Sequence, residues 1–249
     1  MKSRTRLILL GVTGFAVSLV SLLPASIAIQ MAGVNSKDVQ LIKPSGTIWN
    51  GEAQSLLMMR QEFNSVEWQV NPLSLLGGSG NVDVRSNDDD YPLTGNISLG
   101  MNGDVDAENL RGILPASMLG QFRAMALVSL DGKLGIKIKD LLIENQAISS
   151  VNGEIVLNQG RLTAPVNTAL GDIKLVLSEQ KGNVRVDIKD QGAPIGIEGT
   201  LILRPGNKMS FNALLSPGAN ADQFLMTMLK NVATPQSDGR LKVQYDGVY

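Results

Sequence analysis

The sequence predicts an all-β protein, mainly antiparallel, with a curved or sandwich-like sheet and one or two short helices, behind one N-terminal transmembrane helix. Three observations carry this prediction. The chain opens with an uncharged apolar run, its apolar residues alternate at a period of two from Val39 onward, and it has 26 glycines but only 4% aromatic residues. Such alternation turns one face of a strand toward a core and the other toward water.

The N-terminal segment joins a basic cluster to an apolar run of spanning length. Lys2, Arg4 and Arg6 precede residues 7–29, a run of 23 residues without a charge. As a helix, this run would cover roughly 30 Å of hydrocarbon. Basic flanks of a membrane helix stay on the cytoplasmic side, so the rest of the chain is expected on the far side of the membrane.

This run divides the chain into three parts. We expect a cytoplasmic tail at residues 1–6, a signal-anchor helix at residues 7–29 and an exported domain at residues 30–249, which would lie in the periplasm of a bacterium with two membranes. The alternative is a cleaved signal peptide, with Ser26 and Ala28 as the small residues before the cut.

Alternating apolar residues predict a series of strands in the exported part. They recur about every 10 to 15 residues, as in an antiparallel all-β domain. The alternating sets are Val66/Trp68/Val70, Val82/Val84, Leu134/Ile136/Ile138, Ile173/Leu175/Leu177, Val184/Val186/Ile188, Ile195/Ile197/Leu201/Leu203, Met209/Phe211/Ala213 and Leu241/Val243/Tyr245. Between them, turns are expected at Asp131-Gly132, Asn152-Gly153, Lys181-Gly182-Asn183 and Pro205-Gly206-Asn207.

A weak repeat places a glycine before alternating aliphatic residues. It recurs at Gly80, Gly95, Gly153, Gly182 and Gly199. One interpretation is that glycine simply starts a strand after a turn. The other is a long, strongly twisted or curved sheet in which glycine relieves crowding on an almost purely aliphatic inner face.

Two segments break the period of two and suggest helices. Residues 106–119 have Leu110, Ile113 and Leu114 at helical spacing, with Pro115 dividing the segment. Residues 220–232 form the better amphipathic pattern, which predicts a helix that covers one end of the β core; a helix that faces a partner or a membrane is the alternative.

Composition excludes several kinds of chemistry. The chain has no His and no Cys, so it has no Ser–His triad, no thiolate nucleophile and no zinc site of the usual ligands. A formal net charge of −1 argues against nucleic-acid binding, which needs a basic surface. We expect no cofactor, no metal and no enzymatic activity.

Two weak motifs do not change this expectation. The acidic run 88–90 lacks the alternating ligands of a calcium loop and is read as a solvated loop. Residues 77–80 lack the Lys-Ser/Thr of a phosphate-binding loop and are read as a turn. A carbohydrate-acting enzyme would require two inward-facing carboxylates in an open cleft.

Two tryptophan motifs carry a resemblance to a known family. Trp49 lies in Gly-Thr-Ile-Trp-Asn-Gly-Glu-Ala at residues 46–53, and Trp68 begins Trp-x-x-x-Pro-Leu-Ser-Leu-Leu at residues 68–76. Together with the basic stub, the apolar run and the terminal Tyr-Asp-Gly, they resemble the type II secretion system protein N family over essentially the whole chain.

The resemblance implies a non-catalytic, single-pass component of the bacterial inner membrane. Such a component would help to export folded proteins across the outer membrane through contacts with other secretion subunits of the inner membrane and periplasm. Trp49, Trp68 and Pro72 are the candidate partner-contact residues; the alternative is that each tryptophan anchors the core or a sheet edge. The resemblance carries over no catalytic residue.

A second resemblance leaves another function open. Glycine-led aliphatic strands behind one N-terminal span also look like the AsmA-type proteins, whose curved sheets form apolar grooves for lipid. The inner face would then bind or transfer acyl chains, because hydrophobic burial contributes roughly 0.8 kcal/mol per methylene group. Alternation alone does not distinguish a groove from a closed core.

Overall fold

In the computed structural model, a single antiparallel sheet accounts for most of the described chain. The structure describes residues 22–27, 39–121, 129–145, 147–165, 167–193, 195–218, 226–227, 229–230 and 233–248. The strands are β1 (Val39–Gly46), β2 (Asn50–Met58), β3 (Gln61–Asn71), β4 (Ser79–Ser86), β5 (Leu93–Gly100), β6 (Val105–Pro115), β7 (Ser129–Glu144), β8 (Ala147–Ala164), β9 (Thr168–Gln180), β10 (Asn183–Asp190), β11 (Ile195–Arg204), β12 (Lys208–Pro217), β13 (Thr234–Pro235) and β14 (Leu241–Val248). Two 3₁₀ turns, η1 (Ser74–Gly77) and η2 (Ala116–Gln121), join β3 to β4 and follow β6.

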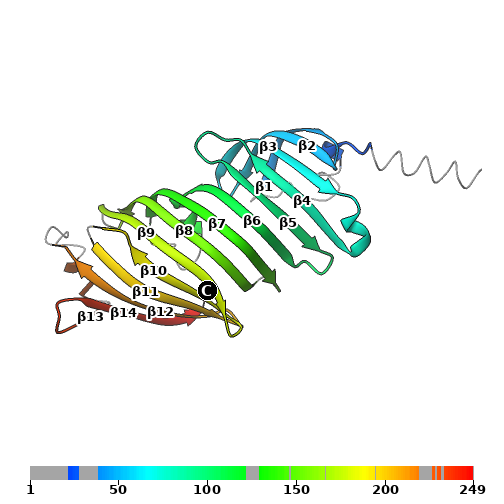
Figure 1. Ribbon diagram of the computed structural model, residues 1–249. Helices are drawn as coiled ribbons and strands as arrows, with labels where there is room; N and C mark the ends of the chain where they lie inside the picture. The colour runs from blue at the N-terminus through cyan, green and yellow to red at the C-terminus, as the bar shows by residue number, and fades with distance from the viewer. Residues whose placement is uncertain are drawn as a thin grey trace, which may run out of the picture.

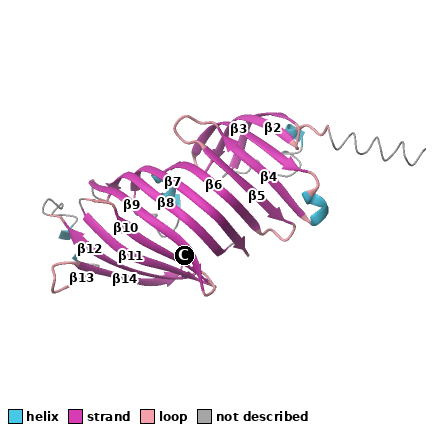
Figure 2. Ribbon diagram, in the orientation of Figure 1, coloured by secondary structure: helices cyan, strands magenta, loops and turns pink. Residues whose placement is uncertain are grey.

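The strands follow one another across the sheet almost in chain order. Within the described residues they form one 14-stranded sheet in which each strand from β1 to β12 is hydrogen-bonded to the next, and β14 lies between β12 and β13. Every pairing is antiparallel. Figures 1 and 2 show the result as one long, curved ribbon of strands with very little helix. The all-β, antiparallel, curved-sheet prediction is confirmed.

Cross-strand register gathers the aliphatic side chains on one face, which we call the inner face. From β7 to β12, one row of directly paired residues crosses this face: Ile138, Gly153, Leu177, Val186, Leu201 and Phe211. The neighbouring positions along each strand point to the opposite, outer face. There, polar cross-strand pairs hydrogen-bond to each other, including Asp140 with Asn152 (2.6 Å) and Asn212 with Gln244 (2.7 Å).

The inner face forms its core by contacts between neighbouring strands. Its centre is buried at Ile138, Val151, Val184 and Val186, while the aliphatic residues packed around them are only partly buried. A second cluster joins Phe63, Val66 and Met118 at the β1–β6 end. The aliphatic side chains around the centre of the inner face are therefore still partly exposed.

Glycines relieve crowding at three of the five repeat positions. At Gly153 an added Cβ would lie 2.7 Å from Cα of Ile138, and at Gly199 it would lie 2.8 Å from Cβ of Ala213. At Gly95 it would overlap a side chain of the next strand, β6. Relief of crowding is thus confirmed for Gly95, Gly153 and Gly199.

The other two repeat glycines have different roles. Gly182 has φ of 73° in the β9–β10 turn, a backbone conformation that residues with a Cβ rarely adopt. At Gly80 an added Cβ would make only ordinary van der Waals contacts. For Gly182, the simpler interpretation of a glycine in the turn before a strand therefore holds.

Two of the predicted turns are wrong. Asn152-Gly153 lies inside β8, paired with β7, and Asp131-Gly132 lies inside β7 at a β-bulge where the register shifts. In both places, pairing with long neighbouring strands outweighs the local turn preference of Asn-Gly and Asp-Gly. The turns at 181–183 and 205–207 are confirmed.

The predicted helix at residues 106–119 is also wrong. Residues 106–115 belong to strand β6, which pairs with both β5 and β7, and only Ala116–Gln121 form a 3₁₀ turn. Asn109 has φ of 53° and the register shifts beside it. This bulge interrupts the alternation of faces along β6. The spacing of Leu110, Ile113 and Leu114 therefore resembles that of a helix.

The second predicted helix, at residues 220–232, lies mostly outside the described residues. Its described residues, 226–227 and 229–230, are helical. Met226 and Leu229 pack against the buried Leu215, Ala233 and Leu241. This agrees with a segment that covers one end of the inner face.

Most of the expected signal-anchor at residues 7–29 lies outside the described residues, which here are 22–27. Pro24 forms an isolated bridge with Thr47, and the N–H of Ile48 donates to the carbonyl of Leu23 (3.1 Å). Among the described residues, no helix combines the length and apolar character needed to cross a membrane.

Replacing Gly153 by alanine should destabilise the sheet. The new methyl group would strike the backbone of β7, which moves only if the strand pairing shifts, so we expect a loss of about 1–3 kcal/mol in the free energy of unfolding. Gly77→Ala is the matched control, because a Cβ there meets nothing within 4 Å. Thermal unfolding of the full chain in detergent would measure both; equal midpoints would contradict close packing at Gly153.

Candidate functional site

The three candidate residues Trp49, Trp68 and Pro72 all lie where β2 begins and β3 ends. We call this place the proximal rim and define it by residues 22–27, 47–51, 68–80 and 99–103. The N–H of Val70 in β3 donates to the carbonyl of Trp49 (2.7 Å), which joins the two tryptophan segments. The structure therefore brings the two motifs together at one end of the sheet.

Each tryptophan at this rim is half-buried, and Pro72 is exposed. The Trp68 ring covers its cross-strand partner Gly51 so closely that a Cβ on Gly51 would overlap the ring. Trp68 thus packs against the sheet and explains why glycine stands in the Trp-Asn-Gly motif. The sequence did not indicate this contact, because it depends on the register of the β2–β3 hairpin.

The turn that follows Pro72 is held by hydrogen bonds among its own polar groups. Asn71 accepts bonds from the N–H of Leu73 at its side chain (3.0 Å) and from the Ser74 hydroxyl at its carbonyl (2.6 Å). The Ser74 hydroxyl in turn accepts from the N–H of Asn81 (3.0 Å). Gly78 ends η1 in the left-handed conformation, so the turn expected at residues 77–80 is confirmed at Gly77 and Gly78, while Ser79 and Gly80 already belong to β4.

The acidic run 88–90 differs from the expected solvated loop at its first residue. Asp88 is buried, and its carboxylate accepts bonds from the N–H (2.9 Å) and side-chain amide (2.8 Å) of Asn64, and from the N–H groups of Asp90 (2.9 Å) and Tyr91 (3.0 Å). The backbone bond from Asn64, aided by the other donors, lowers the pKa of Asp88. Asp88 therefore fastens the β4–β5 connection to β3.

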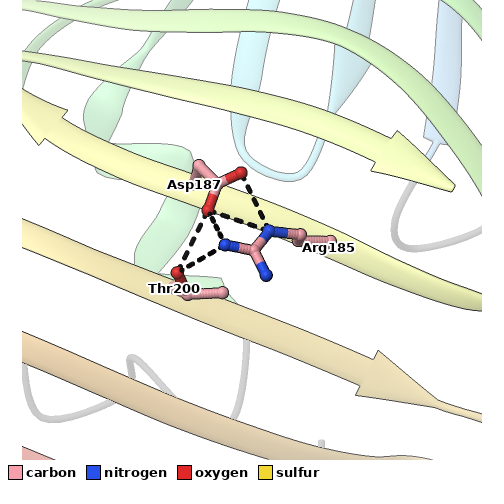
Figure 3. A network of polar contacts seen from close by, with 3 residues as sticks. All are labelled: Arg185, Asp187 and Thr200. Carbon is pink, nitrogen blue, oxygen red and sulfur yellow. Dashed lines mark hydrogen bonds and ion pairs between the residues drawn. The ribbon is translucent and has the colours of Figure 1, made fainter. Parts of the chain in front are cut away.

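A polar cluster occupies the outer face of β10 and β11 (Figure 3). The Arg185 guanidinium donates to both carboxylate oxygens of Asp187 (2.6–3.0 Å), and the Thr200 hydroxyl donates to the same carboxylate (3.0 Å). The hydrogen bond from Arg185 lowers the pKa of Asp187. An aspartate held ionised in this way makes a poor general acid.

The outer face also carries an open groove near the proximal rim, with a volume of about 840 Å³. Glu52 and Glu67 line it as direct cross-strand partners, and both are exposed. Glu52 accepts from the Ser45 hydroxyl (3.1 Å), and Glu67 accepts from the Asn87 amide (2.9 Å). Both carboxylates thus remain in contact with water.

The acidic side chains do not converge on a metal-binding site in the described part of the chain. There, no three Asp or Glu side chains lie close enough together to hold a metal ion. Even the run 88–90 diverges, because Asp88 accepts from backbone N–H groups while Asp90 pairs with Lys133 (2.9 Å).

The two edges of the sheet differ in their ability to accept another strand. In β1, Lys43 has φ of 49° and Pro44 has no N–H to donate. At the other edge, β13 covers only Leu241 and Lys242 of β14. Residues 243–248 of β14 therefore have no further strand beside them among the described residues, and Tyr245 and Val248 are exposed.

These features define a class of protein: a single curved sheet with one aliphatic face, one polar face and an open C-terminal edge. The family described as "Type II secretion system (T2SS), protein N" matches residues 37–244. The chain belongs to this family, as the two tryptophan motifs predicted, and it is thereby linked to type II secretion.

Relatives of known name cover nearly the whole chain. It is 24% identical to "Type II secretion system protein N" of Aeromonas hydrophila over 99% of both chains. It is 21% identical to the protein of that name in Vibrio cholerae serotype O1 over 96% of both, and 24% identical to the one in Klebsiella pneumoniae over 99% of this chain and 97% of the relative. No solved structure matches the chain.

Replacing Asp88 by asparagine should destabilise the protein. An amide in place of one carboxylate oxygen would face backbone N–H donors and leave them unsatisfied, at a cost of about 1–3 kcal/mol. Because folding lowers the pKa of Asp88, its contribution is present above the pKa of the unfolded chain and is lost as the pH falls through the folded-state pKa.

Unfolding midpoints measured from pH 7 down to about pH 3, the range in which aspartates titrate, would test this explanation. The difference between the natural chain and Asp88→Asn should narrow as the pH falls, whereas the exposed Asp89→Asn should resemble the natural chain throughout. A difference that stays constant with pH would contradict the role of the ionised carboxylate.

Proposed function

We propose that the chain is a non-catalytic, single-pass component of the type II secretion machinery in the bacterial inner membrane. Residues 7–29 anchor it, and the sheet lies in the periplasm, where it contacts other secretion subunits. The family match supports the link to type II secretion, and the uncharged run behind Lys2, Arg4 and Arg6 supports the topology.

The open edge of β14 is the observation that carries a contact role. An unpaired strand edge presents a row of N–H and C=O groups to which another chain can add a strand. Residues 243–248 contain no proline, and the neighbouring β13 stops after Pro235. Natural sheets usually protect an edge of this kind with lysine, proline or a bulge, as β1 does with Lys43 and Pro44.

A partner strand on β14 would also have apolar side chains to pack on. Tyr245 projects from the inner face, opposite Phe211, and Val248 projects from the outer face, opposite Lys208. Their exposed fractions are 53% and 70%. Aromatic side chains of this kind contribute strongly to protein interfaces.

Blocking this edge should weaken binding of the other secretion subunits. In the full chain, Tyr245→Lys with Val248→Lys places charges on the edge, and we expect about a tenfold loss of co-purified subunits, the effect of losing roughly 1.4 kcal/mol. The amount of secreted protein in the culture medium should fall in parallel.

Ile42→Lys on the β1 edge is the matched control, because Ile42 is an exposed apolar residue of the opposite edge strand. It should retain both binding and secretion. Unchanged binding by the β14 variant, or an equal loss with Ile42→Lys, would contradict a specific role of the β14 edge.

Lipid binding by the inner face is a second candidate function. It is favoured by one observation: the residues packed around the central cluster, among them Leu110, Leu177 and Leu201, are only partly buried. A curved face of aliphatic side chains left partly open can accept acyl chains, as the resemblance to AsmA-type proteins implies.

Adjacent residues of β9 offer a matched test of lipid binding. Leu177 points to the inner face, and Val176 points to the outer face, where it is exposed. A photoreactive amino acid at position 177 of the full chain should form phospholipid adducts in cells, detected by intact mass, and one at position 176 should not. Adducts at neither position, or at both equally, would contradict an inner-face groove.

A further inference from the structure

We propose that the proximal rim is a membrane-contacting surface, which inserts exposed apolar side chains into the outer leaflet of the same bilayer that holds residues 7–29. This rests on the proposed anchor. It adds that the sheet meets the membrane at a defined place, through side chains far from the apolar run in the sequence.

The first observation is a cluster of exposed apolar side chains. Leu73 (72% exposed), Leu75 (50%), Leu99 (51%) and Met101 (91%) lie at this rim. The N–H of Met101 donates to the carbonyl of Gly78 (3.3 Å), which joins the β5–β6 turn to the end of η1. Leu99 is the cross-strand partner of Gly80, and a Cβ at Gly80 would lie 3.7 Å from the Leu75 side chain. The turn that carries Leu73 and Leu75 thus lies against the strand end that carries Leu99 and Met101.

The second observation is that this rim has no charge in its central segments. Residues 47–51, 68–80 and 99–103 contain no Asp, Glu, Lys or Arg, although the whole chain has 22 basic and 23 acidic residues. Charged groups resist removal from water more strongly than any others. Three segments without charged residues meet at one end of the sheet, and such a surface is suited to transfer from water into lipid.

The third observation is the point at which the N-terminal run reaches the sheet. Leu23 and Pro24 contact residues 47–48, and Trp49 in turn contacts Val70, three residues before the exposed Leu73. The side chains at positions 22 and 27 are themselves exposed and apolar. Residues 22–27 belong to the proposed anchor at 7–29, so their contact with residues 47–48 brings the cluster close to the lipid.

Internal hydrogen bonds hold several polar groups of the turn that carries Leu73 and Leu75. The bonds of Asn71, Ser74 and Asn81 satisfy the turn from within, so Leu73 and Leu75 are presented on a fixed backbone. Apolar side chains on such a turn bind a membrane surface more strongly as more of their apolar area is buried in the lipid. A bilayer fits this cluster better than an acidic or basic protein partner, because the central segments have no charge to pair with one.

Site-specific probes can test this contact, because the chain has no cysteine. Leu75→Cys and Met101→Cys in the full chain each provide one attachment point for an environment-sensitive fluorophore. Met59→Cys is the matched control: Met59 is an exposed methionine in the β2–β3 turn, at the other end of β3. Vesicles of phosphatidylethanolamine and phosphatidylglycerol with nitroxide-labelled lipids provide the quencher.

We expect a blue shift and a loss of fluorescence at positions 75 and 101, and neither change at position 59. Absence of quenching at 75 and 101, in a chain that floats with the vesicles, would overturn the contact and leave the anchor standing. Equal quenching at all three positions would also overturn it. A chain that does not float with the vesicles would overturn the anchor and the contact together.

Discussion

Cross-strand register is the constraint on which the rest of the structure depends. Each side chain must point to the same face as its partner on the next strand, because a slip of one residue would turn a whole strand over. In the row from Ile138 to Phe211, this rule carries an apolar or glycine residue across six consecutive strands. The inner core and the polar outer face both follow from it.

The register also explains why a glycine stands among bulky side chains on the inner face. Gly153 lies between Ile138 and Leu177 in the inner row, and the absence of a Cβ there leaves room for Ile138. The same relation holds at the proximal rim, where Gly51 leaves room for the Trp68 ring. Glycine thus acts here through the space it leaves for a partner on the neighbouring strand.

The sequence predicted much of the fold because alternation is a local signal. Strands such as β9, β10 and β11 could be read directly from their apolar residues. Bulges were not visible: at Asn109 and at Asp131-Gly132 the local pattern suggested a helix or a turn, while pairing with neighbouring strands decided the conformation. Asp88 was missed for the same reason, since its main partner, Asn64, lies 24 residues away.

The candidate site was predictable in part. The tryptophan motifs identified the family, but only the β4–β5 pairing brings Met101 to the end of η1.

The order of strands in this sheet has a consequence for its assembly. From β1 to β12, every strand pairs with the one made just before it, so the loops to be closed are short and the entropy lost in closing them is small. As the chain is made from its N-terminus, it can therefore add hairpins to a growing sheet in the order in which they emerge. Such growth has no need to wait for the later strands to emerge.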